Sequence, residues 1–564
     1  MIQTASNFFI FCITIFIAIT FTSAGLYLTD ELAPANQLHQ LAEGHQLTYH
    51  EDKYGFYADG TIDKYITGTN YVMIYSLMVP VVSFPVYSFT SLFPDASRLV
   101  PLIFWILMLI SITTTVGILY KKELADRIYY IYAITCIAIF LNAVFYSRFA
   151  YDNLEVLSIV TTNIILYGLF GVVIWKMTCY LFYENNKRIF VWIATMSCSS
   201  LLFWVGAIKD HMLVALLFII ILYTVIKFYD TNDTGYLLYT AAASGLIMWE
   251  RPELSISVIP IICLLIIYRY KKYCIRPLST YGIVTFLFAT PALINNYIVT
   301  GSIFKFPFQA VNQTIGGAHL SSSINAVDIL LNELPTYIVN NMLGISVDNI
   351  IRIMIYPFNG GVGILPIIML SIFTIILLPY FIFIKKLELI EPEIILFIFS
   401  FVVSLSYFCI SALGFNLHAE SGILPDMRLF SLIYAPIIIA SLSVISRIYI
   451  LNYKTVIRRF VIWFGITLTV FAIILMVVSN KGIMTTSHIN FTANCIGLIV
   501  FAISTAVIID TLRTNRVDGL ETIIPIIVSL PLTWQIFTSI ITAKLYSYPM
   551  YIPLMELIKK LVFG

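Results

Sequence analysis

The chain has 564 residues, of which 60% are hydrophobic and only 11% are charged, and its formal net charge is +2. Soluble proteins carry about 25% charged residues, so this composition excludes a water-soluble globular fold. It indicates a polytopic membrane protein, because helices that face lipid need apolar side chains all round. No dense Lys/Arg cluster points to a nucleic-acid partner.

Apolar runs long enough to cross a bilayer follow one another along the chain. A spanning helix needs about 20 such residues. The first run has no basic segment before it and is interpreted as a transmembrane helix, with a signal peptide as the alternative. We therefore predict an all-α bundle of about 13 to 16 transmembrane helices, with runs near 7–29, 99–119, 128–145, 154–178, 189–207, 211–229, 235–249, 254–268, 279–299, 362–384, 391–413, 429–447, 460–479, 491–510 and 522–542.

One further run, 71–93, contains Pro80 and Pro85 and is not expected to be a simple spanning helix. The positive-inside rule supports this interpretation. If the N-terminus is inside and 71–93 does not cross, the basic loops all fall on one side: Lys121, Lys122, Arg127, Lys187, Arg188, Arg269, Lys271, Lys272, Arg276, Lys385, Lys386, Arg447, Lys454, Arg458, Arg459, Arg513 and Arg516. We therefore expect two long outer loops, at 30–98 and 301–361, and 71–93 lying at the interface within the first of them.

With this topology, eleven ionisable residues meet at the outer interface: Asp30, Glu31, Arg148, Asp152, Lys209, Asp210, His211, Arg251, Glu253, Asp426 and Arg428. Charged side chains near a membrane are costly, so they are candidates for a functional site. The alternatives are a solvated helix end for Asp30 and Glu31, a structural pair of Arg148 with Asp152, and an interfacial pair or helix cap at Lys209 and Asp210. Neither the eight cysteines nor His39, His45 and His50 have the spacing of a usual metal site.

Six segments resemble, in order, motifs of the GT-C superfamily, the membrane glycosyltransferases that use polyprenyl-phosphate sugars. They are TDELAPANQLHQLAEGH (29–45), IKDHMLVALLFI (208–219), GLIMWERPEL (245–254), PALINNYIVTGSIF (291–304), YPFNGGVGILP (356–366) and LPDMRLFSLIYAP (424–436). The resemblance is to mannosyltransferase-like and aminoarabinose-transferase-like members. The WWDYG signature of oligosaccharyltransferases and the Lys-Pro-Pro of aminoarabinose-type enzymes are both missing, which leaves the donor sugar open.

The resemblance implies a catalytic transmembrane module at 1–300, whose first outer loop carries membrane-parallel helices. The outer loop at 301–361 follows it. The C-terminal transmembrane helices then occupy 362–564, with no separate soluble domain. The site would face outward, and the expected location is the cell membrane.

The implied reaction is an inverting transfer of one sugar from a polyprenyl-phosphate donor to a lipid, glycan or protein acceptor. Asp30 is expected to be the general base, with Glu31 orienting the acceptor. Arg251 and Arg428, then Arg148 and Lys209, are expected to bind the donor phosphate, whose negative charge develops during transfer. Asp152, Asp210 and Glu253 are expected to bind substrate. No cofactor is expected with certainty; a divalent metal ion, if one is used, would be held by Asp30 and Asp152.

Two other classes of membrane protein stay open. A transporter or lipid flippase also has many helices, but it favours charges at mid-helix and often shows inverted repeats. A polysaccharide polymerase or ligase shares the long outer loops and the lipid-linked substrates, but relies on Arg and His there. The Asp30-Glu31 pair after the first helix and the charges gathered at one interface favour the glycosyltransferase.

Overall fold

The computed structural model describes residues 2–21, 32–44, 66–67, 72–73, 76–97, 99–119, 128–145, 153–303, 314–315, 318–319, 353–355, 362–412, 426, 428–480 and 486–545. Its larger helices are α1 (Ile2–Phe21), α2 (Leu32–Ala42), α3 (Met78–Thr90), α4 (Leu99–Leu119), α5 (Ile128–Phe145), α6 (Leu154–Leu181), α7 (Asn185–Ser197), α8 (Leu201–Trp204), α9 (His211–Thr231), α10 (Thr234–Glu250), α11 (Pro252–Tyr270), α12 (Ile275–Thr300), α16 (Ile364–Ile367), α17 (Met369–Phe383), α18 (Glu391–Ala412), α19 (Ser431–Ile448), α20 (Tyr453–Asn480), α21 (Thr486–Thr514) and α22 (Asp518–Leu545).

Short elements complete the described chain. Three are 3₁₀ turns: η5 (Pro94–Ala96), η6 (Lys271–Tyr273) and η9 (Arg428–Phe430). Two antiparallel ladders pair β1 (Ile66–Thr67) with β2 (Val72–Met73) and β3 (Thr314–Ile315) with β4 (Ala318–His319). The predicted all-α, multi-pass architecture is confirmed, because ten of the described helices are long and apolar enough to cross a membrane. Three shorter apolar helices accompany them, at Met78–Thr90, Tyr129–Phe140 and Met369–Phe383.

The spanning helices divide into central and peripheral ones. Most residues of α6, α9, α19 and α22 are buried against other helices, whereas most residues of α12, α20 and α21 are half-buried or exposed. The exposed residues of the peripheral helices are largely Ile, Phe and Val. Apolar side chains on an outward face are what contact with lipid requires. The bundle is therefore built around a buried centre and coated with a lipid-facing layer.

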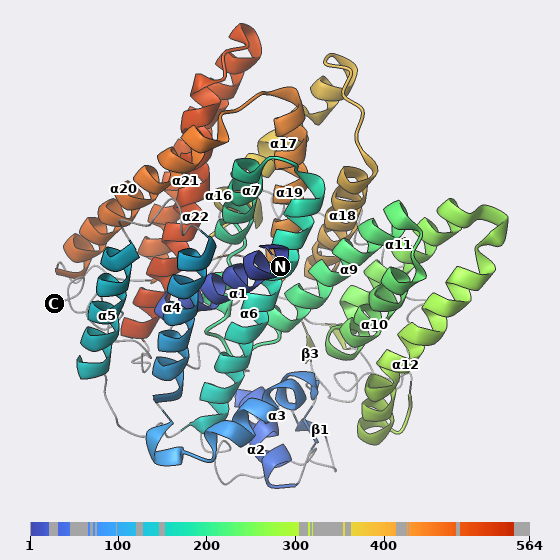
Figure 1. Cartoon of the computed structure of the whole chain (residues 1–564). Helices are drawn as coiled ribbons and strands as arrows, with labels where there is room; N and C mark the ends of the chain where they lie inside the picture. Colours follow the sequence, from blue (N-terminus) through green and yellow to red (C-terminus); the bar gives the residue numbers. More distant parts are fainter. Residues whose placement is uncertain are drawn as a thin grey trace.

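Helices α2 and α3 lie together at one end of the bundle, where α3 packs on α6 (Figure 1). Helix α3 has 13 residues and so is about 20 Å long at 1.5 Å per residue, short of the roughly 30 Å of a hydrocarbon core. The prediction that 71–93 does not form one straight spanning helix is confirmed. The turns that join α11 to α12 and α17 to α18 lie at the opposite end (Figure 1).

One run that was predicted to be continuous, 189–207, is broken into α7 and α8. The break falls where Ser200 takes a positive φ of 53°. Serine hydroxyls compete with the helix ladder, and here Ser199 donates to the Met196 carbonyl at 2.9 Å. Gln535 of α22 compensates, since it accepts from the Leu202 amide at 3.0 Å and donates to the Ser197 carbonyl at 2.6 Å. The run at 362–384 is likewise divided into α16 and α17.

Candidate active site

The first element of the candidate site is the turn between α8 and α9, at the end of the bundle that carries α2 and α3. This turn holds Lys209 and Asp210, and Lys209 is buried. Asn163 of α6 supports it from beneath, because its amide donates to the Ala207 carbonyl at 2.9 Å and lies 3.5 Å from the Lys209 carbonyl. The turn is thereby fixed by a buried side chain of a central helix.

The second element is the junction of α10 and α11 at Trp-Glu-Arg-Pro-Glu. Pro252 is the first residue of α11, and the residue before a proline is pushed out of the helical region. Arg251 accordingly has φ −134° and ψ 83°, while its amide still donates to the Ile247 carbonyl at 2.7 Å. The helical conformation is interrupted at Arg251 alone, and the Arg251 guanidinium points to the turn between α8 and α9.

Arg251 and Asp210 form a two-point ion pair that joins these elements. Arg251 Nε donates to Asp210 Oδ2, and Nη2 donates to Oδ1 at 2.9 Å. The side chains retain 11% and 15% of their exposure, so the pair is largely but not completely withdrawn from solvent. Burial alone would raise the pKa of Asp210, but the charge and hydrogen bonds of Arg251 outweigh it and hold that pKa well below its usual range.

His211 belongs to the same group, since Arg251 Nη2 lies 3.2 Å from His211 Nδ1. A guanidinium can only donate, so Nδ1 accepts and a neutral His211 carries its proton on Nε2. The His211 ring also packs on Trp204, with 4.7 Å between ring centroids. The first residue of α9 is thus held by both the arginine and the indole.

A second buried carboxylate, Asp426, is fixed beside this group. Ser200 Oγ donates to Asp426 Oδ2 at 2.6 Å, and Trp204 Nε1 donates to Oδ1 at 2.9 Å. Asp426 is 1% exposed, and burial of a carboxylate is tolerable only with such donors. The residue that the sequence places before α19 therefore anchors the broken helix α7–α8 and, through Trp204, the position of His211.

Glu250, the last residue of α10, places another carboxyl against the ion pair. Its Oε2 atom is buried and has no hydrogen-bond partner among the described residues. Burial, followed by the negative charge of Asp210, raises the pKa of Glu250 to about 8, although a hydrogen bond from Ser76 opposes the rise. Ser76 lies two residues before α3. Its hydrogen bond therefore connects the first predicted outer loop to Glu250 of α10.

Of the eleven residues predicted at the outer interface, the structure brings Asp210, His211 and Arg251 into direct contact. The charges of Lys209 and Glu253 also act on the pair of Asp210 and Arg251. Asp426 lies beside it through Trp204. Arg428 begins η9, but its side chain lies outside the described residues, as do Asp30, Glu31, Arg148, Asp152, His45 and His50 altogether.

Glu250, Trp204 and Tyr407 belong to the site but were not predicted from the sequence, whereas His211 was. Tyr407 of α18 is 2% exposed and acts on the Arg251 guanidinium. Glu250 directly precedes the predicted Arg251, so the sequence did hold a signal for it. Trp204 and Tyr407 are aromatic residues inside apolar runs, and nothing in the sequence distinguishes them from residues that only pack.

His39 of α2, one of the three histidines of the first predicted outer loop, lies beside a carboxylate. Its Nδ1 lies 3.1 Å from Oε1 of Glu155, a fully buried carboxylate in the first turn of α6. No group of three or more His, Cys, Asp or Glu side chains within the described residues is arranged to hold a metal ion. The two residues proposed for a metal, Asp30 and Asp152, lie outside those residues.

The cluster as a whole offers cations that are held in place and carboxylates in different charge states.

No protein-family model and no curated protein matches this chain. Among solved structures, it is similar to ArnT from Cupriavidus metallidurans bound to undecaprenyl phosphate, with a TM-score of 0.46 and 12% identity over 95% of this chain and 76% of that one. The apo state of the same protein gives a TM-score of 0.45 and 11% identity, over 93% and 74%. The function proposed below is based on the residues of this chain.

Proposed function

We propose that this protein is a GT-C-type glycosyltransferase that moves one sugar from a polyprenyl-phosphate donor to a lipid, glycan or protein acceptor on the extracytoplasmic side. The observation that carries the proposal is the ion pair of Asp210 with Arg251. Their segments, 208–219 and 245–254, each resemble a motif of that superfamily, and they meet in one largely buried polar cluster. Asp426, from a third such segment, lies beside them.

The held arginine fits the charge that the reaction develops. When the bond between the anomeric carbon and the phosphate oxygen breaks, the phosphate leaves with the electron pair and gains negative charge. Arg251 uses Nε and Nη2 to hold Asp210, and the guanidinium would bind the phosphate while Asp210 holds it in place. Asp210 would then act as a positioning residue that fixes the guanidinium before the phosphate arrives. Lys209 and Arg428 would add charge to the same phosphate.

The other half of the reaction needs a base for the acceptor. In the proposed mechanism an acceptor hydroxyl attacks the anomeric carbon from the face opposite the phosphate and passes its proton to Asp30. The configuration at that carbon is therefore inverted. Glu31 orients the acceptor, and Asp152 and Glu253 bind sugar hydroxyls. The lipid tail of the donor lies between helices.

The decisive variant is Asp30→Asn, which keeps the size of the side chain but removes the basic carboxylate. Transfer from a panel of polyprenyl-phosphate monosaccharides should fall by about 10²- to 10⁴-fold. Protein yield and binding of undecaprenyl phosphate should change little. An unmutated rate in this variant would remove Asp30 from the mechanism and pass the role to Glu31 or Asp152.

Arg251→Ala should show the opposite balance, losing binding of the donor lipid as well as rate. Arg276→Ala is its matched control, because Arg276 is an exposed arginine near the α11–α12 turn at the other end of the bundle. If both arginine variants bind undecaprenyl phosphate equally well, Arg251 does not contact the donor. If the unmutated protein consumes no donor in the panel, the transporter interpretation takes precedence.

A further inference from the structure

A second polar site lies at the end of the bundle opposite α2 and α3. A cavity of about 400 Å³ is lined there by Lys385, Lys386, Leu387, Glu388, Arg447 and Ile448. These residues come from the turn between α17 and α18 and from the last turn of α19. The cavity is therefore remote from the cluster around Arg251 and belongs to neither predicted outer loop.

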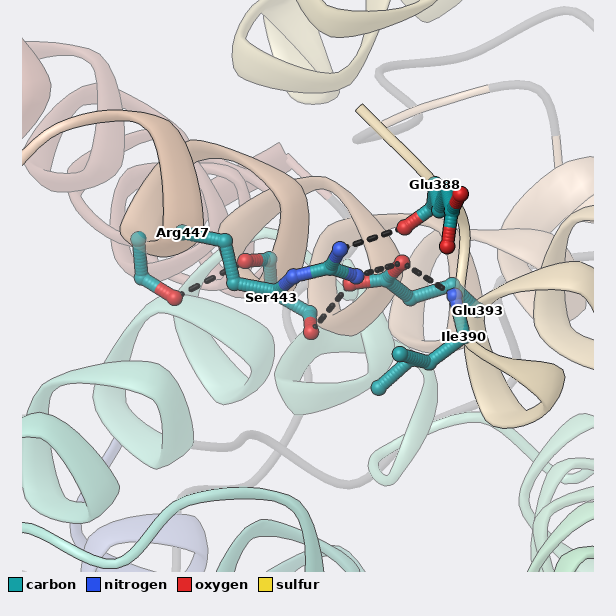
Figure 2. A network of polar contacts seen from close by, with 6 residues as sticks. Glu388, Ile390, Glu393, Ser443 and Arg447 are labelled. Atoms are coloured by element: carbon teal, nitrogen blue, oxygen red, sulfur yellow. Dashed lines mark hydrogen bonds and ion pairs between the residues drawn. The ribbon is translucent and has the colours of Figure 1, made fainter. Parts of the chain in front are cut away.

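The floor of this cavity is rigid because Arg447 is tied down on several sides (Figure 2). Its Nη1 donates to Glu393 Oε2 at 2.7 Å, and its Nη2 donates to the Glu388 carbonyl. Glu393 is 1% exposed and is saturated, since it also accepts from Ser443 Oγ at 2.7 Å and from the Ile390 amide at 3.1 Å. The charge of Arg447 is matched by Glu393, so the pair builds the wall and adds no net charge.

The two lysines supply the unmatched charge. Lys385 is positioned by Asn515 of the α21–α22 turn, to which its Nζ donates at 3.3 Å. Lys386 has a φ of 52° just after α17, and the Leu387 amide donates back to the Phe381 carbonyl at 3.0 Å. Glycine is the usual residue at such a position, because a side chain is strained there. A lysine in its place brings a second ammonium group to the cavity at a local cost.

Apolar side chains adjoin the cavity along the chain. Phe383 and Ile384 directly precede the lysines and are 79% and 65% exposed, and Ile450 follows Ile448 by two residues and is 94% exposed. Phe383 and Ile384 lie at the end of the short apolar helix α17, and Ile450 follows the spanning helix α19; exposed apolar residues at such helix ends can face lipid. A ligand held here by its charged end would have lipid-compatible surface beside it.

We propose that this cavity binds the phosphate headgroup of an anionic phospholipid. Lys385 and Lys386 contribute two positive charges, and the Glu388 carboxylate offsets one, which leaves a net positive charge for one phosphodiester. The acyl chains lie along Phe383, Ile384 and Ile450. Basic pockets between transmembrane helices on the cytoplasmic side hold such headgroups, and the positive-inside orientation places this end there. The site does not depend on the sugar-transfer proposal.

The test uses the full chain purified in a neutral detergent, with native mass spectrometry counting bound phosphatidylglycerol and bound phosphatidylcholine. The unmutated protein should retain phosphatidylglycerol in preference to phosphatidylcholine. A Lys contributes a factor of about five to binding of an anionic lipid, so K385A/K386A should weaken phosphatidylglycerol binding by about 25-fold. Thermal unfolding of the double variant is recorded alongside, and it should be unchanged because both lysines are exposed. K386E alone is a second variant, which should also weaken phosphatidylglycerol binding because it reverses one charge.

The matched control is K271A/K272A, which removes two consecutive exposed lysines at the α11–α12 turn. These lysines lie at the same end of the bundle and do not line the cavity. Equal losses in the two double variants would overturn the proposal, because they would reflect general surface charge. So would the absence of any preference for phosphatidylglycerol in the unmutated protein. Soluble glycerol phosphate is a third arm: if it competes as well as the lipid, the ligand is a free phosphate compound and the lipid assignment is wrong.

Discussion

At the scale of single residues, the candidate site is governed by an imbalance of charge around one arginine. Asp210, Glu250 and Glu253 all interact with Arg251, and among the described residues Asp210 is the one that forms an ion pair with it. A second ionised carboxylate close to Asp210 would meet both repulsion and loss of solvation. Glu250 therefore keeps its proton to about pH 8, while Asp210 stays charged. The two groups can play different roles, one as an acid and one as a fixed anion.

This difference predicts how stability depends on pH. An unfolded Glu titrates near 4.3, so between that pH and about 8 the unfolded chain has released a proton that native Glu250 retains. Unfolding then releases a proton, and stability falls as pH rises through this window. The depressed pKa of Asp210 acts only below its ordinary range, in more acidic solution. We expect the unfolding temperature in detergent to be higher at pH 5.5 than at pH 8.

Glu250→Gln should flatten that slope, because glutamine has no proton to release. Glu184→Gln is the control, since the Glu184 side chain at the start of α7 is exposed to solvent. The measurement is the unfolding temperature of all three proteins at several pH values between 5 and 8.5. A slope that survives unchanged in Glu250→Gln would show that another group binds the proton.

Residue-scale prediction from sequence was only partly possible. Arg251 and Asp210 could be selected because they are charged residues at the predicted ends of apolar runs. Their pairing could not be selected, since they are 41 residues apart and the fold alone brings the two turns together. The role of Asp426 as an anchor for Ser200 and Trp204 spans more than 220 residues, and no local pattern encodes it.

At the scale of elements, the arrangement depends on how closely helices approach. Helices α10 and α12 pack against each other along their length, and Gly245 lies where they meet. A Cβ atom at Gly245 would lie 2.4 Å from the Thr285 carbonyl oxygen and 2.7 Å from Cβ of Phe288. Small residues at helix contacts let backbones come this close in membranes. Because α10 ends at Glu250 and Arg251, its seating on α12 sets the position of the site.

Gly245→Ala should therefore force α10 and α12 apart and lower stability by roughly 1–3 kcal/mol, the usual cost of overpacking. Gly282→Ala in α12 is the matched control, since a Cβ atom there meets nothing within 4 Å. The control should be neutral or more stable by up to about 1 kcal/mol, as expected for Gly to Ala in a helix. Thermal unfolding of both variants in detergent separates them, and an equal effect would exclude close packing as the reason for Gly245.

Element boundaries followed the sequence where a strong local signal existed. Pro252 marked the α10–α11 junction correctly, and the two prolines in 71–93 correctly indicated something other than a spanning helix. The breaks at Ser200 and Ile368 were missed, because both lie inside runs of apolar composition. At Ser200 the local serine hydroxyls act together with Asp426 and Gln535, which offer hydrogen bonds from distant parts of the chain, and apolar periodicity carries no information about such partners.

At the scale of the whole molecule, charge is distributed unequally between the two ends. The turns α11–α12 and α17–α18, which carry Lys271, Lys272, Lys385 and Lys386, lie opposite α2 and α3 (Figure 1). The composition alone predicted a multi-pass membrane protein, which the ten long apolar helices bear out. The direction in which they cross the membrane remains the prediction of the positive-inside rule.

Cysteine labelling in intact cells tests that direction. In a chain whose eight native cysteines are replaced by alanine, Ala310→Cys should react with a membrane-impermeant maleimide from outside. Tyr273→Cys should react only after the cells are opened, because Tyr273 follows the basic pair in the α11–α12 turn and is 71% exposed. Labelling of both positions from the same side would make the proposed topology wrong.

The bond between Gln535 and the broken helix α7–α8 has a consequence for how the chain is made. The Leu202 amide donates to a side chain 333 positions later, so most of the polypeptide is synthesised before that partner exists. Until α22 arrives, the Leu202 amide and the Ser197 carbonyl lack the contacts that a low-dielectric surrounding demands. During synthesis these two backbone groups therefore stay without those partners until α22 packs against α7 and α8. A chain truncated before residue 535 would therefore lack both hydrogen bonds that hold the break between α7 and α8.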